Sequence, residues 1–178
     1  MKKKEFRKWA IERLRNISKQ HSYLRDKKIN KQLKKIIISQ KASTVMIYIP
    51  LQMEVNVMPL IRDLRRRKIE VLVPFMEDKS FRLVKYRLPL YKKKYGIKEP
   101  KNSKQFRRKK IDISIVPIVG LDLSMRRIGF GKGMYDRFFA KNINSIDKII
   151  FVQRALCLST DILTEAHDVT GDELITIR

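Results

Sequence analysis

The residues with the clearest chemical potential lie in the segment RRIGFGKGMYDRFFAK, residues 126–141. Gly129, Gly131 and Gly133 leave the backbone without Cβ atoms, so that its amide N–H groups can converge on an anion. A helix predicted from residue 133 or 134 to about residue 141 adds unpaired N–H groups and the positive end of its dipole. This spacing predicts a phosphate-binding loop that leads into a helix.

Charged and aromatic side chains accompany the glycines. Arg127 and Lys132 supply cations for phosphate oxygens. Asp136 is either a residue that stabilises the first turn of the helix or a ligand for Mg²⁺ beside bound phosphate. Tyr135 offers a ring for stacking and a hydroxyl group, or serves as a core aromatic. The segment does not match the P-loop pattern, in which serine or threonine follows the lysine, because glycine follows Lys132. It does not match the Rossmann pattern G-x-G-x-x-G either, because Met134 stands where the third glycine would be. A glycine-rich turn that binds no ligand is the alternative interpretation.

Apolar periodicity and β-rich runs predict the elements that position this loop. Helices are expected at 3–19, 22–39 and 54–68, and strands at 44–50, 69–75, 81–86, 111–117, 148–153 and 173–177. The polar segment 91–110 is predicted to be a surface loop. Strands that alternate with helices indicate one α/β domain over residues 1–178. We expect a three-layer α/β/α fold with a mostly parallel, mixed central sheet, similar to the Rossmann architecture.

The composition excludes several classes of protein. The chain has 178 residues, 43% of them hydrophobic, which suits a folded domain rather than a disordered chain. The single cysteine, Cys157, excludes an internal disulfide and a cysteine-rich zinc site. No apolar run approaches the roughly 20 residues of a membrane span, and no apolar run follows the basic N-terminus as in a secretory signal. We therefore expect a soluble cytoplasmic protein with no membrane partner.

The formal net charge of +24 is unevenly distributed. Residues 1–40 carry a balance of +11 and residues 62–110 a balance of +14, whereas residues 111–178 are nearly neutral. Such a surplus attracts polyanions, so a nucleic-acid-binding protein is an alternative function. No helix-turn-helix, zinc-finger or aromatic RNA-binding pattern accompanies the charge. A nucleotide-binding α/β module without catalytic activity is a second alternative.

The chain resembles the 5-formyltetrahydrofolate cyclo-ligase family, also called 5,10-methenyltetrahydrofolate synthetases. Its RIGFGKGMYD is similar to the family pattern R-x-G-x-G-x-G-Y-Y-D, with Met134 in place of the first tyrosine. Asn56 likewise stands where the family often has aspartate. Further segments resemble family segments in the same order: KKEFR (3–7), YIPLQMEVNV (48–57), YGIKEP (95–100), VPIVGLD (116–122) and AHDVTGDELIT (166–176). The resemblance covers essentially the whole chain.

The resemblance implies an enzyme that uses ATP and Mg²⁺ to convert 5-formyltetrahydrofolate to 5,10-methenyltetrahydrofolate, releasing ADP and phosphate. The formyl oxygen would attack the γ-phosphate, and the neighbouring folate nitrogen would then close the ring as phosphate departs. We expect a monomer whose substrate carries a single glutamate or a polyglutamate tail. Nucleic acid would bind the basic surface only non-specifically.

The resemblance also implies the roles of individual residues. The ATP-binding set is Lys3, Lys4, Arg7, Arg127, Gly129, Phe130, Gly131, Lys132, Gly133, Met134 and Tyr135. The folate-binding set is Ile49, Glu54, Phe81, Tyr95 and Tyr135. Lys132 and Tyr135 would be catalytic, Asp136 would bind the metal, and Asp168 is a weaker candidate for the same ion. Without the resemblance, Glu54 fits an acid at a helix start, and Lys3 and Arg7 fit solvated surface cations.

Overall fold

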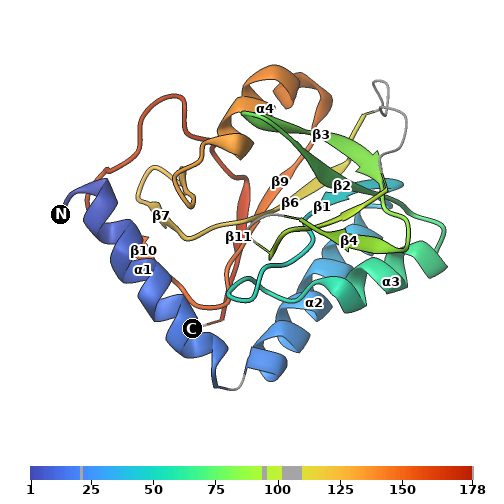
Figure 1. The fold of residues 1–178 in the computed structure, drawn as a ribbon, viewed down its shortest axis with the longest axis horizontal. Helices are drawn as coiled ribbons and strands as arrows, with labels where there is room; N and C mark the ends of the chain where they lie inside the picture. The colour runs from blue at the N-terminus through green and yellow to red at the C-terminus, as the bar shows by residue number, and fades with distance from the viewer. Residues whose placement is uncertain (21, 94–95, 102–109, 178) are drawn as a thin grey trace.

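The computed structural model describes residues 1–20, 22–93, 96–101 and 110–177 (Figure 1). Within these residues a six-stranded sheet has the order β11-β9-β6-β1-β2-β3. Neighbouring strands are parallel except β2 and β3, which form an antiparallel hairpin at one edge. The strands are β1 (Thr44–Ile47), β2 (Glu70–Glu77), β3 (Ser80–Lys85), β6 (Ile113–Pro117), β9 (Ile149–Val152) and β11 (Glu173–Ile175). The predicted mostly parallel, mixed sheet is confirmed.

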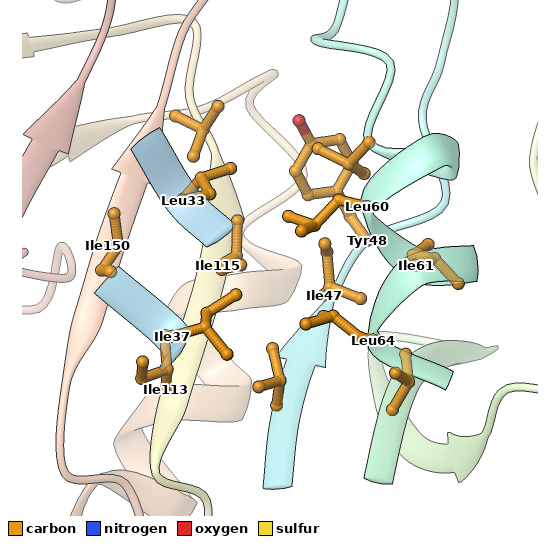
Figure 2. Close-up of a cluster of buried hydrophobic side chains, with 14 of the residues drawn as sticks. Leu33, Ile37, Ile47, Tyr48, Leu60, Ile61, Leu64, Ile113, Ile115 and Ile150 are labelled. Carbon is orange, nitrogen blue, oxygen red and sulfur yellow. The ribbon is translucent and has the colours of Figure 1, made fainter. Parts of the chain in front are cut away.

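Helices α2 (Ser22–Ser39) and α3 (Met58–Arg66) cover one face of this sheet. Successive side chains of a strand point to opposite faces, so Ile47 of β1 faces these helices and Met46 faces away. Figure 2 shows the resulting core, in which aliphatic side chains of both helices meet those of the central strands. Its labelled members are Leu33, Ile37, Ile47, Tyr48, Leu60, Ile61, Leu64, Ile113, Ile115 and Ile150.

Helix α4 (Met134–Asn142) lies on the other face of the sheet. Its buried Phe138 and Phe139 pack with Met46, Phe81 and Phe151. The stacked rings of Phe81 and Phe138 have their centroids 4.5 Å apart, which joins α4 to strand β3. Helices therefore cover both faces of the sheet, as the predicted layering requires.

Helix α1 (Lys3–Ser18) packs outside the central sheet, against a three-stranded sheet of order β10-β7-β8 (Figure 1). These strands are β7 (Gly120–Asp122), β8 (Arg127–Ile128) and β10 (Leu158–Ser159). The apolar stripe of the helix, Phe6, Ala10 and Leu14, is buried with Ile128 and Cys157. This contact places the N-terminal helix beside the strand that leads into the glycine loop.

Two local predictions were wrong. The segment 91–110 was expected to be a surface loop, but its first part pairs strands β4 (Leu90–Lys92) and β5 (Lys98–Pro100). The expectation for residues 102–109 lies outside the described residues. The helix expected over 54–68 begins only at Met58, with Pro59 in its first turn. None of the described helices is long and apolar enough to cross a membrane.

Candidate active site

The glycine loop, residues 129–133, connects β8 to α4; the helix begins where it was predicted, whereas the short strand β8 was not predicted. Gly131 and Gly133 have φ angles of +94° and +62°, which favour glycine because other residues are strained there. Gly129 is needed for a different reason. A Cβ atom at Gly129 would lie 2.3 Å from Nη1 of Arg127, so the loop can approach this side chain only without one.

Arg127 forms the floor of the loop. Its side chain is 5% exposed, and its Nε donates a 3.1 Å hydrogen bond to the carbonyl of Pro117 at the end of β6. The guanidinium lies over the ring of Tyr135, with Cζ 4.7 Å from the ring centroid. Burial lowers the pKa of Arg127, and the nearby Asp136 carboxylate opposes that shift. A buried cation is thus held directly beneath a loop with the backbone of an anion site.

Helix α1 brings two further cations to this region. Nε of Arg7 donates a 2.8 Å hydrogen bond to the carbonyl of Gly129. Lys3 instead forms a 2.6 Å ion pair with Asp168, which also accepts a hydrogen bond from the N–H of Glu165. The structure therefore brings Arg7 to the loop and pairs two predicted ligands, Lys3 and Asp168, with each other.

A cavity of about 790 Å³ lies beside the loop. Its walls come from the ends of β1, β2 and β6, from the start of α4 and from the β4–β5 hairpin. This is the edge where parallel α/β sheets place their ligands. Among its lining residues are the predicted site residues Ile49, Glu54, Arg127, Phe130, Lys132, Gly133, Met134 and Tyr135. The cavity is large enough for a drug-sized ligand.

Glu54 is a titratable group of the cavity wall whose pKa is strongly raised. Its Oε2 accepts a 2.8 Å hydrogen bond from the N–H of Leu51. Burial raises the pKa of Glu54 to about 7, although that hydrogen bond and the charges of Arg127 and Arg154 act in the opposite direction. The carboxyl group therefore changes its charge near neutral pH, as groups at catalytic sites often do.

Tyr135 and Tyr48 line the cavity with Glu54. The pKa of each phenol is raised by burial and, to a lesser extent, by the charge of Glu54. Both hydroxyl groups therefore remain protonated at neutral pH. Tyr48 donates to the carbonyl of Val55 over 2.9 Å, which fixes the same segment that carries Glu54.

Arg154 and Asp26 are important for the site, and the sequence did not identify them. Two nitrogens of Arg154 contact the Asp26 carboxylate at 2.8 and 2.9 Å in a buried pair. The guanidinium also donates to the carbonyls of Gln52, Met53 and Glu54. The pair thus holds the backbone of the segment that carries Glu54. An acidic residue inside the basic segment 22–39 was the one signal that pointed to Asp26.

The two predicted metal ligands, Asp136 and Asp168, differ in how many of their carboxylate oxygens are already occupied by protein contacts. The carboxylate of Asp136 accepts a weak 3.4 Å hydrogen bond from the N–H of Val169 and lies 4.0 Å from Arg127. Asp168 is already bound to Lys3. No group of three or more His, Cys, Asp or Glu side chains suited to a metal occurs in the described part of the chain. Asp136 fits a metal held largely by phosphate oxygens and water, as Mg²⁺ often is.

Two other predicted residues, Phe81 and Lys4, are absent from the cavity lining. Phe81 is buried against Phe138 and meets the ring of Tyr135 edge-on, with centroids 5.0 Å apart. It supports Tyr135 from behind rather than stacking on a ligand, which corrects its predicted role. Lys4 is exposed on α1 and has no place in the cavity lining. Tyr95 lies outside the described residues.

The arrangement is suited to phosphoryl transfer onto a flat organic ligand. The glycine loop and its cations can stabilise phosphate charge, and the adjacent cavity can enclose a ring system beside them. The boundary between the two carries Tyr135 and Glu54, so reacting groups would meet there. The geometry thus brings the glycine loop and its adjacent cations next to a cavity whose walls come from separate segments of the sequence.

Comparison with known proteins gives a consistent result. The model of the 5-formyltetrahydrofolate cyclo-ligase family matches residues 1–177. The chain is similar to the NMR structure of 5,10-methenyltetrahydrofolate synthetase from Aquifex aeolicus, with 27% identity and a TM-score of 0.81, covering 99% of this chain and 90% of that one. It is also similar to the 5,10-methenyltetrahydrofolate synthetase of Mycoplasma pneumoniae, with 25% identity and a TM-score of 0.76, covering 98% of each chain. No curated protein matches.

Proposed function

The chain belongs to the 5-formyltetrahydrofolate cyclo-ligase family, and on this premise we propose how its residues perform the reaction. It is an enzyme that converts 5-formyltetrahydrofolate to 5,10-methenyltetrahydrofolate with ATP as co-substrate. The observation that carries the proposed roles is that residues of the glycine loop, Tyr135 and Glu54 line one cavity.

The reaction requires two successive bond exchanges. The formyl oxygen attacks the γ-phosphorus and ADP leaves, so that a poor leaving group becomes a phosphate. The N10 nitrogen then bonds to the formyl carbon and loses its proton, and the carbon–oxygen bond breaks to release phosphate. The enzyme contributes positioning and charge stabilisation, as in phosphoryl transfer generally.

The glycine loop is proposed to bind the triphosphate. Backbone N–H groups of the loop and of the first turn of α4 would contact phosphate oxygens, as helix N-termini do in other nucleotide sites. Lys132 would neutralise charge that develops on the transferred phosphate. Arg7 and Arg127 hold the loop through Gly129 and Pro117 and place their charges beneath it. Lys3 is proposed to complete the nucleotide site from its ion pair with Asp168.

Asp136 is proposed to hold Mg²⁺ together with the phosphates. Its carboxylate has one weak hydrogen bond from Val169, so it retains oxygen lone pairs for an ion. Bound there, the ion would neutralise phosphate charge. Asp168 fits this role less well because Lys3 and Glu165 already occupy it. Asp136→Asn should weaken Mg²⁺-dependent ATP binding at least tenfold, which calorimetry with and without Mg²⁺ would measure.

The folate ring is proposed to occupy the cavity beside the loop. Ile49 would contact the ring, and Tyr135 would lie between the ring and the nucleotide. The ionised form of Glu54 would accept a hydrogen bond from an N–H group on the ring side of the folate. Its pKa near 7 also suits acceptance of the N10 proton.

A cyclisation assay tests the function directly. The absorbance of the methenyl product should rise when 5-formyltetrahydrofolate, ATP and Mg²⁺ are all present, and should not rise when ATP is omitted. ATP binding without product would indicate the non-catalytic module. Stabilisation by oligonucleotides alone, with a steep dependence on salt, would indicate the nucleic-acid-binding protein instead.

A polyglutamate tail on the substrate is a further part of the proposal. Lys93 and Lys98 of the β4–β5 hairpin line the cavity, and the surrounding segment 62–110 is strongly basic. Each added glutamate should therefore tighten binding at low salt. Equal dissociation constants for the mono- and triglutamate forms at 10 mM salt would exclude this role.

The remaining expectations concern the state of the protein in the cell. We propose that it is a monomer, which sedimentation at the 21.2 kDa of one chain would support. A cytoplasmic location is also proposed and would be tested by cell fractionation.

A further inference from the structure

Glu99 is a buried acid in a wall of the cavity, and neither the reaction nor the glycine loop accounts for it. Glu99 lies on β5 and is 2% exposed. It lines the same cavity as Glu54 and Tyr135. Its neighbours in sequence, Lys98 and Pro100, belong to a basic segment. A buried carboxylate is costly unless it is hydrogen-bonded or paired, so its presence in a cavity wall requires an explanation.

The hydrogen bonds of Glu99 leave part of its carboxylate unused. Oε1 accepts a 2.7 Å hydrogen bond from the N–H of Met76 on β2. Across residues 1–20, 22–93, 96–101 and 110–177, no other hydrogen bond or ion pair to this carboxylate is present. Among the described residues, the fully buried side-chain oxygens and nitrogens that lack a partner are Asn30 Oδ1 and Thr176 Oγ1. Oε2 of Glu99 lacks a partner but does not belong to this set, so it is accessible from outside the protein. The free oxygen therefore faces the cavity and can accept hydrogen bonds from a ligand.

Glu99 and Glu54 are held by different elements. Glu54 is fixed by Leu51 and by Arg154, which follows β9, whereas Glu99 is fixed by Met76 on β2. Strands β6 and β1 stand between β9 and β2 in the sheet. The carboxylates of Glu54 and Glu99 are thus positioned independently. One ligand can hydrogen-bond to both only if it carries donor groups at two separate places.

The folate ring has this distribution of donors. Its pyrimidine end carries an amino group next to a ring N–H, and these two donors point the same way, matching a carboxylate. The formyl-bearing nitrogen lies at the other end of the ring. The cavity around Glu99 is lined by Pro74, Phe75 and Ile97, which suit the faces of a flat ring.

We propose that Glu99 binds the amino group and adjacent ring N–H at the pyrimidine end of the folate, and so sets its orientation. This inference rests on the proposed function, because it needs the folate ring in this cavity. With that end fixed on Glu99, the formyl group at the opposite end is directed away from the β4–β5 hairpin. Glu99 acts as a specificity-determining residue that binds the substrate and takes no part in bond exchange.

The test measures the dissociation constant of 5-formyltetrahydrofolate by calorimetry, without ATP. Glu99→Gln keeps an oxygen acceptor for Met76 but places an amide where the ligand has donors. Its dissociation constant should rise about tenfold or more, since hydrogen bonds to charged groups are among the stronger ones. Glu173→Gln is the matched control, because Glu173 is 38% exposed, is paired with Lys148 and does not line the cavity. It should change the constant less than twofold, and both variants should keep the wild-type melting temperature.

An analogue without the 2-amino group identifies the contact. Wild-type protein should bind it about as weakly as Glu99→Gln binds the natural substrate, and the variant should lose little further affinity. Additive losses, or an unchanged constant for Glu99→Gln, would overturn the assignment of Glu99. Absence of folate binding by wild-type protein would overturn both proposals. Folate binding without turnover would refute only the proposed reaction, since this comparison requires no catalysis.

Discussion

At the residue scale, Gly129 and Arg127 behave as one packed unit. The guanidinium occupies the space in which a Cβ atom of residue 129 would lie, and Arg127 is fixed there by Pro117 and the Tyr135 ring. Residue 129 must therefore be glycine because of the Arg127 side chain. The φ angle of Gly129 does not lie in the left-handed region and would not by itself require glycine. Gly131 and Gly133, by contrast, are required by their positive φ angles.

Gly129→Ala should displace the Arg127 guanidinium and raise the KM for ATP at least tenfold, because the loop and its cation move apart. Steady-state kinetics with varied ATP would measure this. Gly96→Ala is the control, since Gly96 has a φ of +76° but nothing within 4 Å of an added Cβ. It should cost about 1 kcal/mol of stability and leave the KM for ATP unchanged. Equal KM values for Gly129→Ala and wild type would contradict the packing argument.

Glu54 should make the protein less stable as the pH rises. Its pKa is about 7 in the folded state and about 4.3 in the unfolded chain, so the folded state binds the proton more tightly. The stabilisation is complete below pH 4.3 and is lost as the pH increases through 7, with a total of roughly 4 kcal/mol. Glu54→Gln should therefore be more stable than wild type at pH 8 and similar at pH 4.5, as measured by urea unfolding.

The same substitution should reduce activity. In the wild type, kcat/KM should rise with pH through about 7 as Glu54 ionises, and this step should vanish in Glu54→Gln. A Glu54→Gln variant that is more stable at pH 8 yet fully active would show that the buried, ionised carboxylate of Glu54 does not contribute to catalysis.

At the element scale, two segments outside the glycine loop hold the site in place. Helix α1 is anchored by the burial of Phe6 and contacts the loop through Arg7 and Gly129. The segment before α3 is held by the buried pair of Asp26 and Arg154. In both cases a helix distant in sequence determines where a functional residue lies.

Arg7→Ala should weaken ATP binding, because it removes the hydrogen bond to Gly129 and a cation beside the loop. We expect the KM for ATP to increase about tenfold with little change in the KM for folate. Lys8→Ala, at an exposed position of the same helix, controls for the loss of one positive charge. Similar KM values for ATP in the two variants would mean that charge alone, without the contact, explains the effect.

Asp26→Asn should destabilise the fold by about 3–5 kcal/mol, since it leaves the buried Arg154 charge without its partner. Urea unfolding would measure the loss. Asp147→Asn provides the surface comparison, because Asp147 pairs with Lys110 while both side chains are exposed. That substitution should cost less than about 1 kcal/mol. A small effect of Asp26→Asn would indicate that the carbonyls of residues 52–54 suffice to satisfy Arg154.

At the scale of the whole molecule, the net charge of +24 matches the anionic character of ATP and folate. The basic surplus lies in residues 1–110, which include α1, α2, α3 and the β4–β5 hairpin. Such a field raises the rate at which anionic ligands reach a site, and salt screens it. The charge is thus expected to act on association more than on the fold.

Raising the ionic strength from 10 to 150 mM should therefore reduce kcat/KM for both substrates severalfold and leave kcat nearly constant. Stopped-flow association rates would separate this from altered chemistry. Replacing the α2 lysines Lys27, Lys28, Lys31 and Lys35 with glutamine should lower the rate at low salt and flatten its salt dependence. An unchanged salt dependence would exclude steering by this helix.

The sequence by itself determined the elements whose pattern is local. The spacing of Phe6, Ala10 and Leu14 predicted α1, and the β-rich runs predicted the central strands. The glycines predicted a loop that bends before a helix, since the backbone demands of Gly131 and Gly133 follow from residue type. Periodicity and backbone freedom are properties of neighbouring residues, so they can be deduced without a tertiary structure.

Only the tertiary structure decided which distant residues meet. Arg154 and Asp26 are 128 positions apart, and no local pattern pairs them. Lys3 was predicted at the nucleotide and Asp168 at the metal, yet they bind each other. Glu99 enters the cavity because a hairpin in an apparently featureless basic segment folds against β2. Such contacts depend on how complete layers pack together, and this packing fixes the chemical environment of each carboxylate.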